Sequence, residues 1–156
     1  MDDMDRKILN AIQSYPDLAI ADLAQKVGLS HTPCWRRLKK LEEDGVIDGR
    51  VIVLNQAKLG LAVTVFTNIR LRHHDEATLE AFERSARDRP EIVECFSMGG
   101  ESDYVLRVVV ASIDEYESLL KKVLLHFPGV DSIKSNFALK CIKLTTRLPI
   151  RSETWM

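Results

Sequence analysis

The segment spanning residues 20–41 constrains the fold of this chain more than any other. It predicts two short helices joined by a tight turn at Gly28, because glycine most easily adopts the left-handed conformation that ends a helix. Leu23 and Val27 lie on one apolar face of the first helix, and Leu29 returns apolar contact to the core after the turn. This spacing is typical of a helix-turn-helix, whose second helix lies in the major groove of DNA.

The second predicted helix combines an apolar stripe with a cluster of cations. Pro33 fits only in its first turn, where the missing N–H breaks no helical hydrogen bond, and Ser30 or Thr32 can cap it. Four of the five residues at 36–40 are Lys or Arg, and Trp35 precedes them. A cationic face can be merely solvated, but this cluster after such a turn favours contact with DNA. The stripe that faces the core consists of Cys34, Leu38 and Leu41.

A further helix is expected before this pair and would complete a three-helix unit. Asp3 or Asp5 caps its start, and Pro16 ends it. Its apolar face consists of Ile8, Ile12 and Tyr15.

A small hairpin is predicted directly after the helix-turn-helix. Two apolar runs, at residues 46–47 and 51–53, flank an Asp-Gly-Arg sequence at 48–50, which is typical of two short strands around a turn. This hairpin would be the wing of a winged helix and would complete a DNA-binding domain over residues 1–53. Arg50 at its tip either contacts the DNA backbone or stays solvated, and the sequence favours neither. The candidate DNA-contacting residues are Ser30, His31, Thr32, Trp35, Arg36, Arg37, Lys39, Lys40 and Arg50.

The charge balance is unusual for a DNA-binding domain. The whole chain has a formal net charge of −1, and residues 1–50 hold eight Lys and Arg against nine Asp and Glu. The charges are segregated, however, with acidic residues at 2–5 and 42–44 and the cations between them. A local patch can contact phosphates, but weak overall attraction indicates that several copies act together. We therefore expect an oligomer.

The composition is that of an ordinary globular protein, with 46% hydrophobic and 29% charged residues. No apolar run is long enough for a transmembrane helix, and the acidic N-terminus does not resemble a signal peptide. The three cysteines, Cys34, Cys95 and Cys141, are widely spaced and show no metal-ligand spacing. We expect reduced thiols, no bound metal, no membrane association and a cytoplasmic location.

A second domain is predicted over residues 62–147, after a polar linker at 54–61 and before a C-terminal tail at 148–156. Its periodicity alternates between strand and helix in the order βαββαβ, which is the order of a ferredoxin-like fold. Such a sheet has helices on one face only, so its apolar second face favours pairing with another copy. The expected elements are a strand at 62–71, a helix at 76–87, strands at 92–98 and 104–111, a helix capped by Asp114, and a strand at 130–144.

The chain contains several short motifs that follow one another in a set order along its length. They include Leu23-Ala24-x-x-Val27-Gly28-Leu29-Ser30, Arg37-Leu38-x-x-Leu41-Glu42-x-x-Gly45-Val46-Ile47, Gly99-Gly100-x-x-Asp103-Tyr104 and Phe127-Pro128-Gly129-Val130. In this combination the chain resembles the Lrp/AsnC (feast/famine) family of prokaryotic transcription regulators. Segments 32–38 and 145–150 are most similar to its Lrp branch and, within that branch, to a cysteine-responsive subgroup.

The resemblance implies a regulator of amino-acid metabolism or transport that binds double-stranded DNA. It implies homodimers that assemble into tetramers or octamers, and a small amino-acid effector bound near the turn between the second and third strands. In that turn, Gly99 and Gly100 let backbone N–H groups approach a carboxylate, and Asp103 offers an acceptor for an ammonium group. From the residues alone, a plain turn with Asp103 bonded to its own backbone is the alternative. The candidate effector-binding residues are Met98, Gly99, Gly100, Glu101, Ser102, Asp103 and Tyr104, with Ser132 and Lys134 from a neighbouring subunit.

Two other classes of protein are possible. One is an RNA-binding or small-molecule-binding ferredoxin-like protein without operator specificity. RNA-binding modules share the βαββαβ order, but the strand at 104–111 lacks their paired aromatic residues. The N-terminal helix-turn-helix pattern argues against a stand-alone amino-acid-binding module. An enzyme would need a nucleophile and base, a metal site or a phosphate loop, and the sequence shows none of these patterns. His73 and His74 follow a strand and are expected to lie in a solvated loop. The sequence therefore predicts no cofactor and no enzymatic activity.

Overall fold

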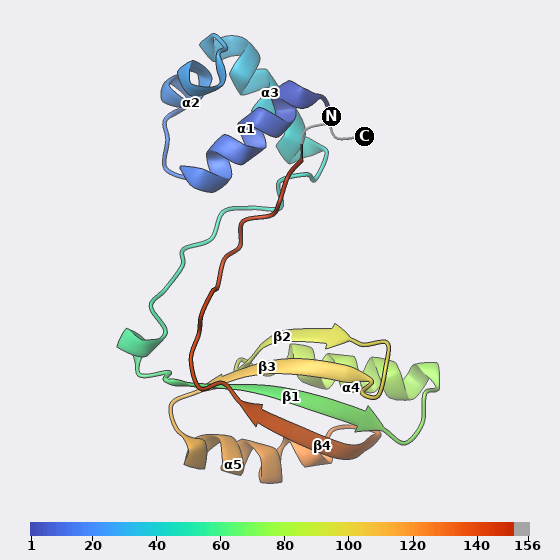
Figure 1. Ribbon diagram of the computed structural model, residues 1–156. Helices are drawn as coiled ribbons and strands as arrows, with labels where there is room; N and C mark the ends of the chain where they lie inside the picture. Colours follow the sequence, from blue (N-terminus) through green and yellow to red (C-terminus); the bar gives the residue numbers. More distant parts are fainter. Residues whose placement is uncertain (152–156) are drawn as a thin grey trace. The chain divides into compact units, whose positions relative to one another are not determined.

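The computed structural model describes residues 1–151 and divides the chain into two compact units (Figure 1). Over the described residues, the first unit consists of Met1–Val53 together with residues 143–151, and the second spans Leu54–Ile142. The predicted α+β class is confirmed, since the first unit is helical and the second contains a four-stranded sheet. Residues 152–156 of the predicted tail lie outside the described residues.

The first unit contains the predicted helix-turn-helix, formed by α2 (Ile20–Val27) and α3 (His31–Glu43) after the first helix α1 (Asp3–Ser14). Gly28 ends α2 in the left-handed conformation, with a φ of 78°. Ser30 occupies the N-cap position of α3 without a capping hydrogen bond from its side chain. The buried core joins all three helices and consists of Ile8, Leu9, Leu23, Ala24, Cys34, Leu38 and Leu41.

Helix α1 is capped by Asp2, so the prediction of Asp3 or Asp5 is wrong. The Asp2 carboxylate accepts a hydrogen bond from the Asp5 N–H at 2.9 Å, and the Asp5 carboxylate accepts one from the Asp2 N–H at 2.9 Å. This reciprocal capping box satisfies two N–H groups at the helix start. An acidic run offers several similar caps, and the three-residue spacing to a second carboxylate selects Asp2.

The predicted hairpin over residues 46–53 is also wrong. The structure assigns neither strand nor helix to this segment. Ile47 packs against the core of the first unit, but Val51, Ile52 and Val53 are largely exposed, Ile52 at 88%. A two-stranded hairpin is marginally stable in water unless one of its faces is packed. The apolar run at 51–53 is not packed against the rest of the unit, and a stable hairpin would need such packing.

The C-terminal segment contributes to the first unit. The Gln13 side chain donates to the carbonyl oxygen of Leu148 at 3.2 Å and accepts from the N–H of Leu148 at 2.6 Å. Arg6 Nη1 donates to the carbonyl oxygen of Arg151 at 3.1 Å, and Ile150 packs against the helical core. The first unit is therefore built from two separate stretches of the sequence.

The second unit is an antiparallel sheet in the order β2-β3-β1-β4, with two helices packed on one face (Figure 1). The βαββαβ order confirms the predicted ferredoxin-like fold. Two short 3-10 helices, η1 (Ala57–Leu59) and η2 (Leu124–His126), lie in connecting segments. The main elements are β1 (Val63–Leu71), α4 (Glu76–Arg87), β2 (Ile92–Ser97), β3 (Tyr104–Val110), α5 (Ile113–Lys122) and β4 (Val130–Phe137).

Helix α5 begins at a different cap from the predicted one. The Ser112 hydroxyl accepts a hydrogen bond from the Glu115 N–H at 3.1 Å, whereas Asp114 lies in the first turn. A carboxylate in the first turn interacts favourably with the helix dipole even when it is not the cap. Asp114 therefore fits a helix start without being the capping residue.

Strand β4 ends at Phe137, so the predicted extension to residue 144 is wrong. The N–H of Ala138 still donates to the carbonyl oxygen of Thr64 at 2.9 Å. Because β1 begins at Val63, residues after Ala138 find no partner strand among the described residues. Leu139, next in sequence, is 99% exposed.

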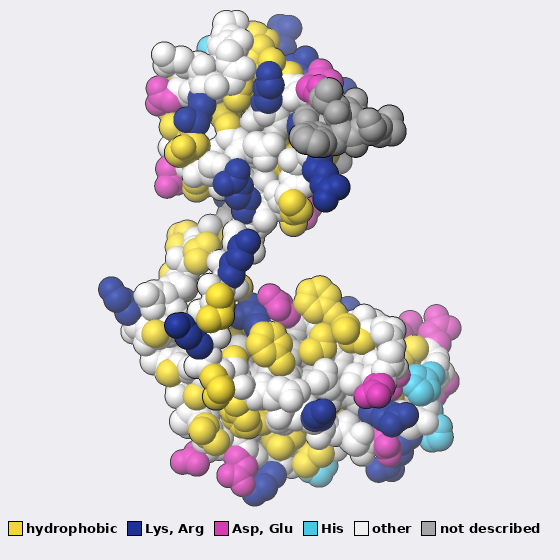
Figure 2. All heavy atoms as spheres, in the orientation of Figure 1, with side chains coloured by type: hydrophobic (Ala, Val, Ile, Leu, Met, Phe, Trp, Pro, Cys, Tyr) yellow, Lys and Arg dark blue, Asp and Glu magenta, His cyan; other side chains and the backbone are white. Residues whose placement is uncertain are grey.

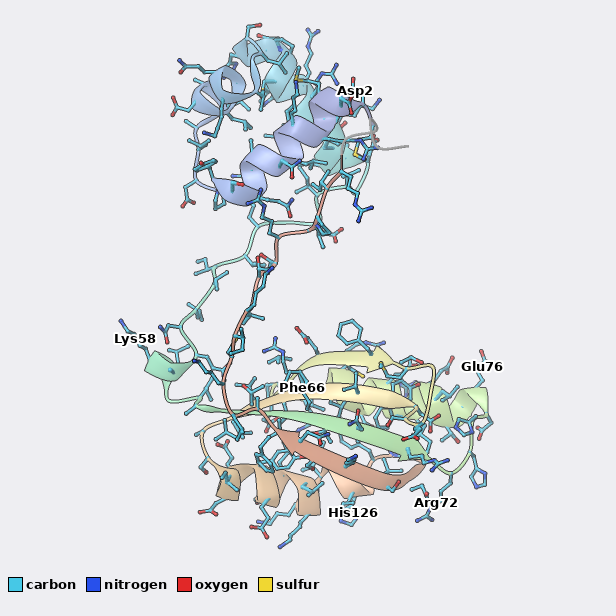
Figure 3. The ribbon with its side chains drawn as sticks, viewed as in Figure 1. Asp2, Lys58, Phe66, Arg72, Glu76 and His126 are labelled. Carbon is cyan, nitrogen blue, oxygen red and sulfur yellow. The ribbon has the colours of Figure 1, made fainter. Side chains whose placement is uncertain are left out.

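The face of the sheet opposite the helices carries exposed apolar side chains, as predicted. Phe66 on β1 lies directly across from Arg107 on β3, and Phe96 on β2 lies across from Val105. Phe96 is 59% exposed, and the Arg107 guanidinium donates to Glu94 at 3.0 Å. Figure 2 shows several hydrophobic side chains on the unit that contains the sheet, and Figure 3 labels Phe66. We call this surface the open sheet face.

Replacing Gly129 by alanine is expected to destabilise the second unit. Gly129 has a φ of 73°, and a Cβ there would lie 2.3 Å from Cγ2 of Thr78. Thr78 cannot easily turn away, because its hydroxyl donates to Asp75 at 2.7 Å and its N–H to the same carboxylate at 3.0 Å. We expect a loss of about 2–4 kcal/mol in the free energy of unfolding from strain and overlap together, measured by urea denaturation.

Gly60→Ala is the matched control for this substitution. Gly60 has a similar φ of 75°, but no atom lies within 4 Å of the added Cβ. This variant should therefore show only the cost of the left-handed backbone, about 1 kcal/mol. Equal losses in the two variants would contradict the predicted overlap with Thr78.

Candidate DNA-binding face and effector site

The exposed side of α3 carries most of the candidate DNA-contacting residues. The opposite stripe of the helix is buried, so α3 is held in a fixed orientation on the first unit. Trp35 is 47% exposed, although an indole can bury a large apolar area. Lys39 lies 3.6 Å from Glu42, in a solvent-exposed pair. The exposed residues of this face are His31, Thr32, Trp35, Arg36, Lys39 and Lys40.

Arg37 has a different environment from its neighbours. Its Nη1 donates to Asp2 at 2.7 Å and to Asp5 at 2.8 Å, so it joins α3 to the start of α1. These contacts raise the pKa of Arg37. The Asp5 N–H first, and Arg37 second, lower the pKa of Asp2 from 3.8 to about 2. From the sequence, Arg37 was predicted to contact DNA together with the other cations of this helix. Helical spacing does not reveal carboxylates more than thirty residues away.

The contact between α1 and α3 is expected to weaken in acid. The pKa of Asp2 is about 2 in the folded protein against an ordinary 3.8, so its ionised form stabilises the fold above pH 4. This contribution is lost as the pH falls from about 4 to 2. NMR titration of the Asp2 carboxyl carbon should give a midpoint near 2. In Arg37→Gln the midpoint should rise but stay below 3.8, because the Asp5 N–H still donates. A wild-type midpoint at 3.8 would contradict the contact.

The C-terminal segment changes the charge balance of the first unit. Residues 143–151 add Lys143, Arg147 and Arg151 and no acidic residue. Over its described residues the unit therefore holds eleven Lys and Arg against nine Asp and Glu. This net positive charge favours association with a polyanion.

Arg50 is exposed, but it does not lie at the tip of a hairpin. It lines a shallow hollow together with Pro16, Asp17 and residues 51–53. An extended, solvent-exposed segment does not fix the direction of this side chain.

The turn between β2 and β3 contains the candidate effector-binding residues. The Met98 N–H donates to the carbonyl oxygen of Asp103 at 2.8 Å and closes the turn. Gly100 has a φ of 145°, and no atom lies within 4 Å of a Cβ built on Gly99 or Gly100. Ser102 is partly buried, whereas Glu101 and both glycines are exposed. The backbone of the turn is therefore accessible to a small molecule.

Asp103 connects this turn to the end of β1. Its N–H donates to the carbonyl oxygen of Ile69 at 2.8 Å, and its Oδ2 accepts from the Leu71 N–H at 2.7 Å. Its Oδ1 lies 2.8 Å from Nε2 of His74. The Leu71 N–H, followed by His74, lowers the pKa of Asp103. Asp103 thus bonds to the backbone of another strand, and His74, predicted to be only solvated, is its partner.

Tyr104 points away from the open turn. It is buried beside Phe82, with ring centroids 4.5 Å apart. Its hydroxyl donates to Glu83 on α4 at 2.7 Å, and burial raises its pKa. Of the candidate effector-binding residues in this turn, Tyr104 is the one that belongs to the core.

Ser132 and Lys134 lie on β4, where both are exposed. Ser132 pairs with Arg70 and Lys134 with Asn68 of β1. Strand β1 separates β4 from β3 in the sheet, so β3 and β4 are roughly 10 Å apart. One copy of the chain therefore does not place these two residues against the β2–β3 turn.

Among the described residues, no helix is long and apolar enough to cross a membrane. Over residues 1–151, no three His, Cys, Asp or Glu side chains are arranged to hold a metal ion.

A helix-turn-helix joined to a ferredoxin-like domain defines a class of DNA-binding transcription regulators. Residues 1–48 match the family of winged helix-turn-helix DNA-binding domains, and residues 64–148 match the Lrp/AsnC ligand binding domain. The chain belongs to the Lrp/AsnC family of transcriptional regulators. This membership favours the regulator over the RNA-binding module and the enzyme.

Characterised relatives cover nearly the whole chain. It is 39% identical over 150 residues to the DNA-binding transcriptional activator DecR of Escherichia coli (strain K12), covering 96% of this chain and 99% of that protein. It is 41% identical over 150 residues to the Bkd operon transcriptional regulator of Pseudomonas aeruginosa, covering 96% and 98%.

Solved structures show the same fold. An AsnC family transcriptional regulator from Agrobacterium tumefaciens is 47% identical, with a TM-score of 0.90 and coverage of 96% of this chain and 97% of that one. A transcriptional regulator from Neisseria meningitidis, solved in complex with L-Met, is 34% identical, with a TM-score of 0.91 and coverage of 96% of each chain.

Proposed function

We propose that this protein binds operator DNA through the exposed face of α3 and that an amino acid controls the binding. The observation that carries the first part is the cationic face of α3, which is fixed by a buried stripe and left open to solvent. Arg36 and Lys39 contact bases or phosphates, while Thr32 and Trp35 pack against sugar or a thymine methyl group. The contact with the DNA sugar-phosphate backbone is completed by His31, Lys40 and the Ser30 hydroxyl.

Arg37 and Arg50 have separate roles in this proposal. Arg37 orients α3 through its ion pairs with Asp2 and Asp5. Arg50 lies in an extended exposed segment and contacts phosphates without reading sequence.

The effector site is proposed at the β2–β3 turn. The accessible backbone at Gly99 and Gly100 suits a carboxylate, and the ionised Asp103 suits an ammonium group. Met98, Glu101 and Ser102 surround that position, and Ser132 and Lys134 reach it from a neighbouring subunit. Support comes from the L-Met complex of the Neisseria relative.

The names of the relatives refer to different amino acids. One is a glutamate uptake regulatory protein and another a leucine-responsive regulatory protein. L-Cysteine, the effector of the cysteine-responsive subgroup, is therefore one candidate among several. The protein then acts in the cytoplasm as a regulator of amino-acid metabolism or transport, without an enzymatic step.

Two copies are proposed to pair through their open sheet faces. Phe66 and Phe96 are exposed on this surface, and pairing would remove them from water. A dimer would place two α3 helices in successive major grooves about 34–36 Å apart. Such dimers would assemble into tetramers or octamers.

The first experiment is a gel-shift titration on the DNA upstream of the gene, with and without L-methionine, L-leucine, L-glutamate or L-cysteine. Salt-sensitive binding that one amino acid changes supports both parts of the proposal. Binding indifferent to all amino acids contradicts the effector site. Absence of binding by a folded oligomer contradicts the DNA-binding role, and light scattering on the same sample gives the number of subunits.

A further inference from the structure

The Asp103 carboxylate is already in use in the protein without an effector. One oxygen accepts the Leu71 N–H at 2.7 Å, and the other lies 2.8 Å from Nε2 of His74. The Asp103 side chain is 24% exposed, whereas His74 is 62% exposed. The backbone contact is thus fixed by the sheet, and the imidazole contact lies on the solvent side.

His74 is positioned by a short connection between β1 and α4 that is fixed at both ends. At one end, the Arg72 N–H donates to the carbonyl oxygen of Gly129 at 2.9 Å, and Arg72 Nε lies 3.4 Å from Asp131. At the other end, Asp75 caps α4 through Thr78. Figure 3 labels Arg72 and Glu76, which bracket this connection. The imidazole is therefore presented to Asp103 by an ordered backbone.

We propose that His74 sets the affinity of the effector site by occupying Oδ1 of Asp103 until the ammonium group of an amino acid replaces it. This inference rests on the proposed function, because it assumes that the effector binds at the β2–β3 turn. It assigns a role to a residue outside the turn itself.

The chemistry favours this exchange. An ammonium group carries a full positive charge and three N–H donors, whereas an imidazole nitrogen supplies one donor. The carboxylate that receives it is ionised at neutral pH, since the Leu71 N–H lowers its pKa. The bond to Leu71 persists during the exchange and keeps Asp103 in place. In the proposed exchange each binding event breaks the contact with His74, and the loss of that contact weakens the observed affinity.

Removing the imidazole should strengthen effector binding. Calorimetric titrations of the full-length protein with L-methionine, L-leucine, L-glutamate and L-cysteine would compare wild type with His74→Ala. A solvent-exposed pair of this kind is worth up to about 1 kcal/mol, so we expect a Kd about two- to fivefold lower. His74→Gln, which keeps an amide donor at a similar reach, should return the Kd towards wild type.

His73→Ala is the matched control, because it removes the adjacent histidine and leaves the bond between His74 and Asp103. Its Kd should equal that of wild type. An unchanged or higher Kd for His74→Ala, or the same decrease in both variants, would overturn the role of His74. If none of the four amino acids binds to the wild-type protein, the effector assignment itself fails.

A spectroscopic measurement tests the exchange directly. The nitrogen-15 shift of His74 Nε2 should move when the bound amino acid is added to wild-type protein, while the shift of His73 stays in place. A stationary His74 signal in a protein saturated with the amino acid would overturn the proposal, whatever the Kd of the variants.

Discussion

Replacing Arg36 by alanine is expected to lower the affinity for operator DNA more than tenfold at physiological salt. Arg36 is exposed on α3. Asp2 and Asp5 bind the neighbouring Arg37, so the Arg36 side chain is available to DNA. An arginine can donate two hydrogen bonds to one guanine, and such a contact is worth about 1–3 kcal/mol. The dissociation constant for the upstream DNA, measured by fluorescence anisotropy, checks this prediction.

Lys7→Ala is the matched control for the Arg36 variant. Lys7 is exposed on α1, so its removal changes the net charge by the same amount without altering α3. We expect a small, salt-dependent loss of affinity that is equal for operator and unrelated DNA. If the two variants lose the same affinity, Arg36 acts only through its charge and does not read the operator.

Asp103→Asn is expected to weaken amino-acid binding at least about tenfold and to abolish the effector response in the gel shift. A hydrogen bond to a charged group contributes about 1.5–3 kcal/mol. The asparagine oxygen can still accept the Leu71 N–H, so the end of β1 keeps its contact with the turn. DNA affinity without effector should match wild type, since Asp103 belongs to the second unit.

Glu80→Gln separates this effect from a general loss of negative charge. Glu80 is exposed on α4, in the same unit but outside the β2–β3 turn. This variant should retain the effector response, because an exposed carboxylate away from the site contributes little to binding. A normal response from Asp103→Asn would place the effector elsewhere in the protein.

Periodicity predicted the elements whose side chains fill a core. The helix at 76–87 matches α4 because Phe82 and Ala86 are buried at helical spacing. The strand at 104–111 matches β3 to within one residue because its apolar run fills the sheet. The turn at Gly28 was predictable since few other residues adopt its backbone conformation.

Apart from the caps of α1 and α5, which depend on neighbouring residues, the incorrect predictions concern segments whose structure depends on distant partners. The runs at 46–53 and 138–144 have strand-like composition, but a strand also needs a neighbour, and composition does not supply one. His74 lies exposed in a loop as predicted, but the sequence did not predict that Arg37 and His74 contact carboxylates 35 and 29 residues away. Spacing along one helix or loop carries no information about such contacts.

The two hydrogen bonds between Gln13 and Leu148 determine when the first unit can be completed during protein synthesis. Residues 1–53 leave the ribosome first, but the contacts of Leu148, Ile150 and Arg151 with α1 and its core await the synthesis of the entire second unit. A nascent chain can therefore form α1, α2 and α3 early, yet it acquires a complete DNA-binding unit only after its effector domain exists. A chain interrupted before residue 148 would contain α1, α2, α3 and the second unit, but it would lack the contacts that Leu148, Ile150 and Arg151 make with α1 and its core.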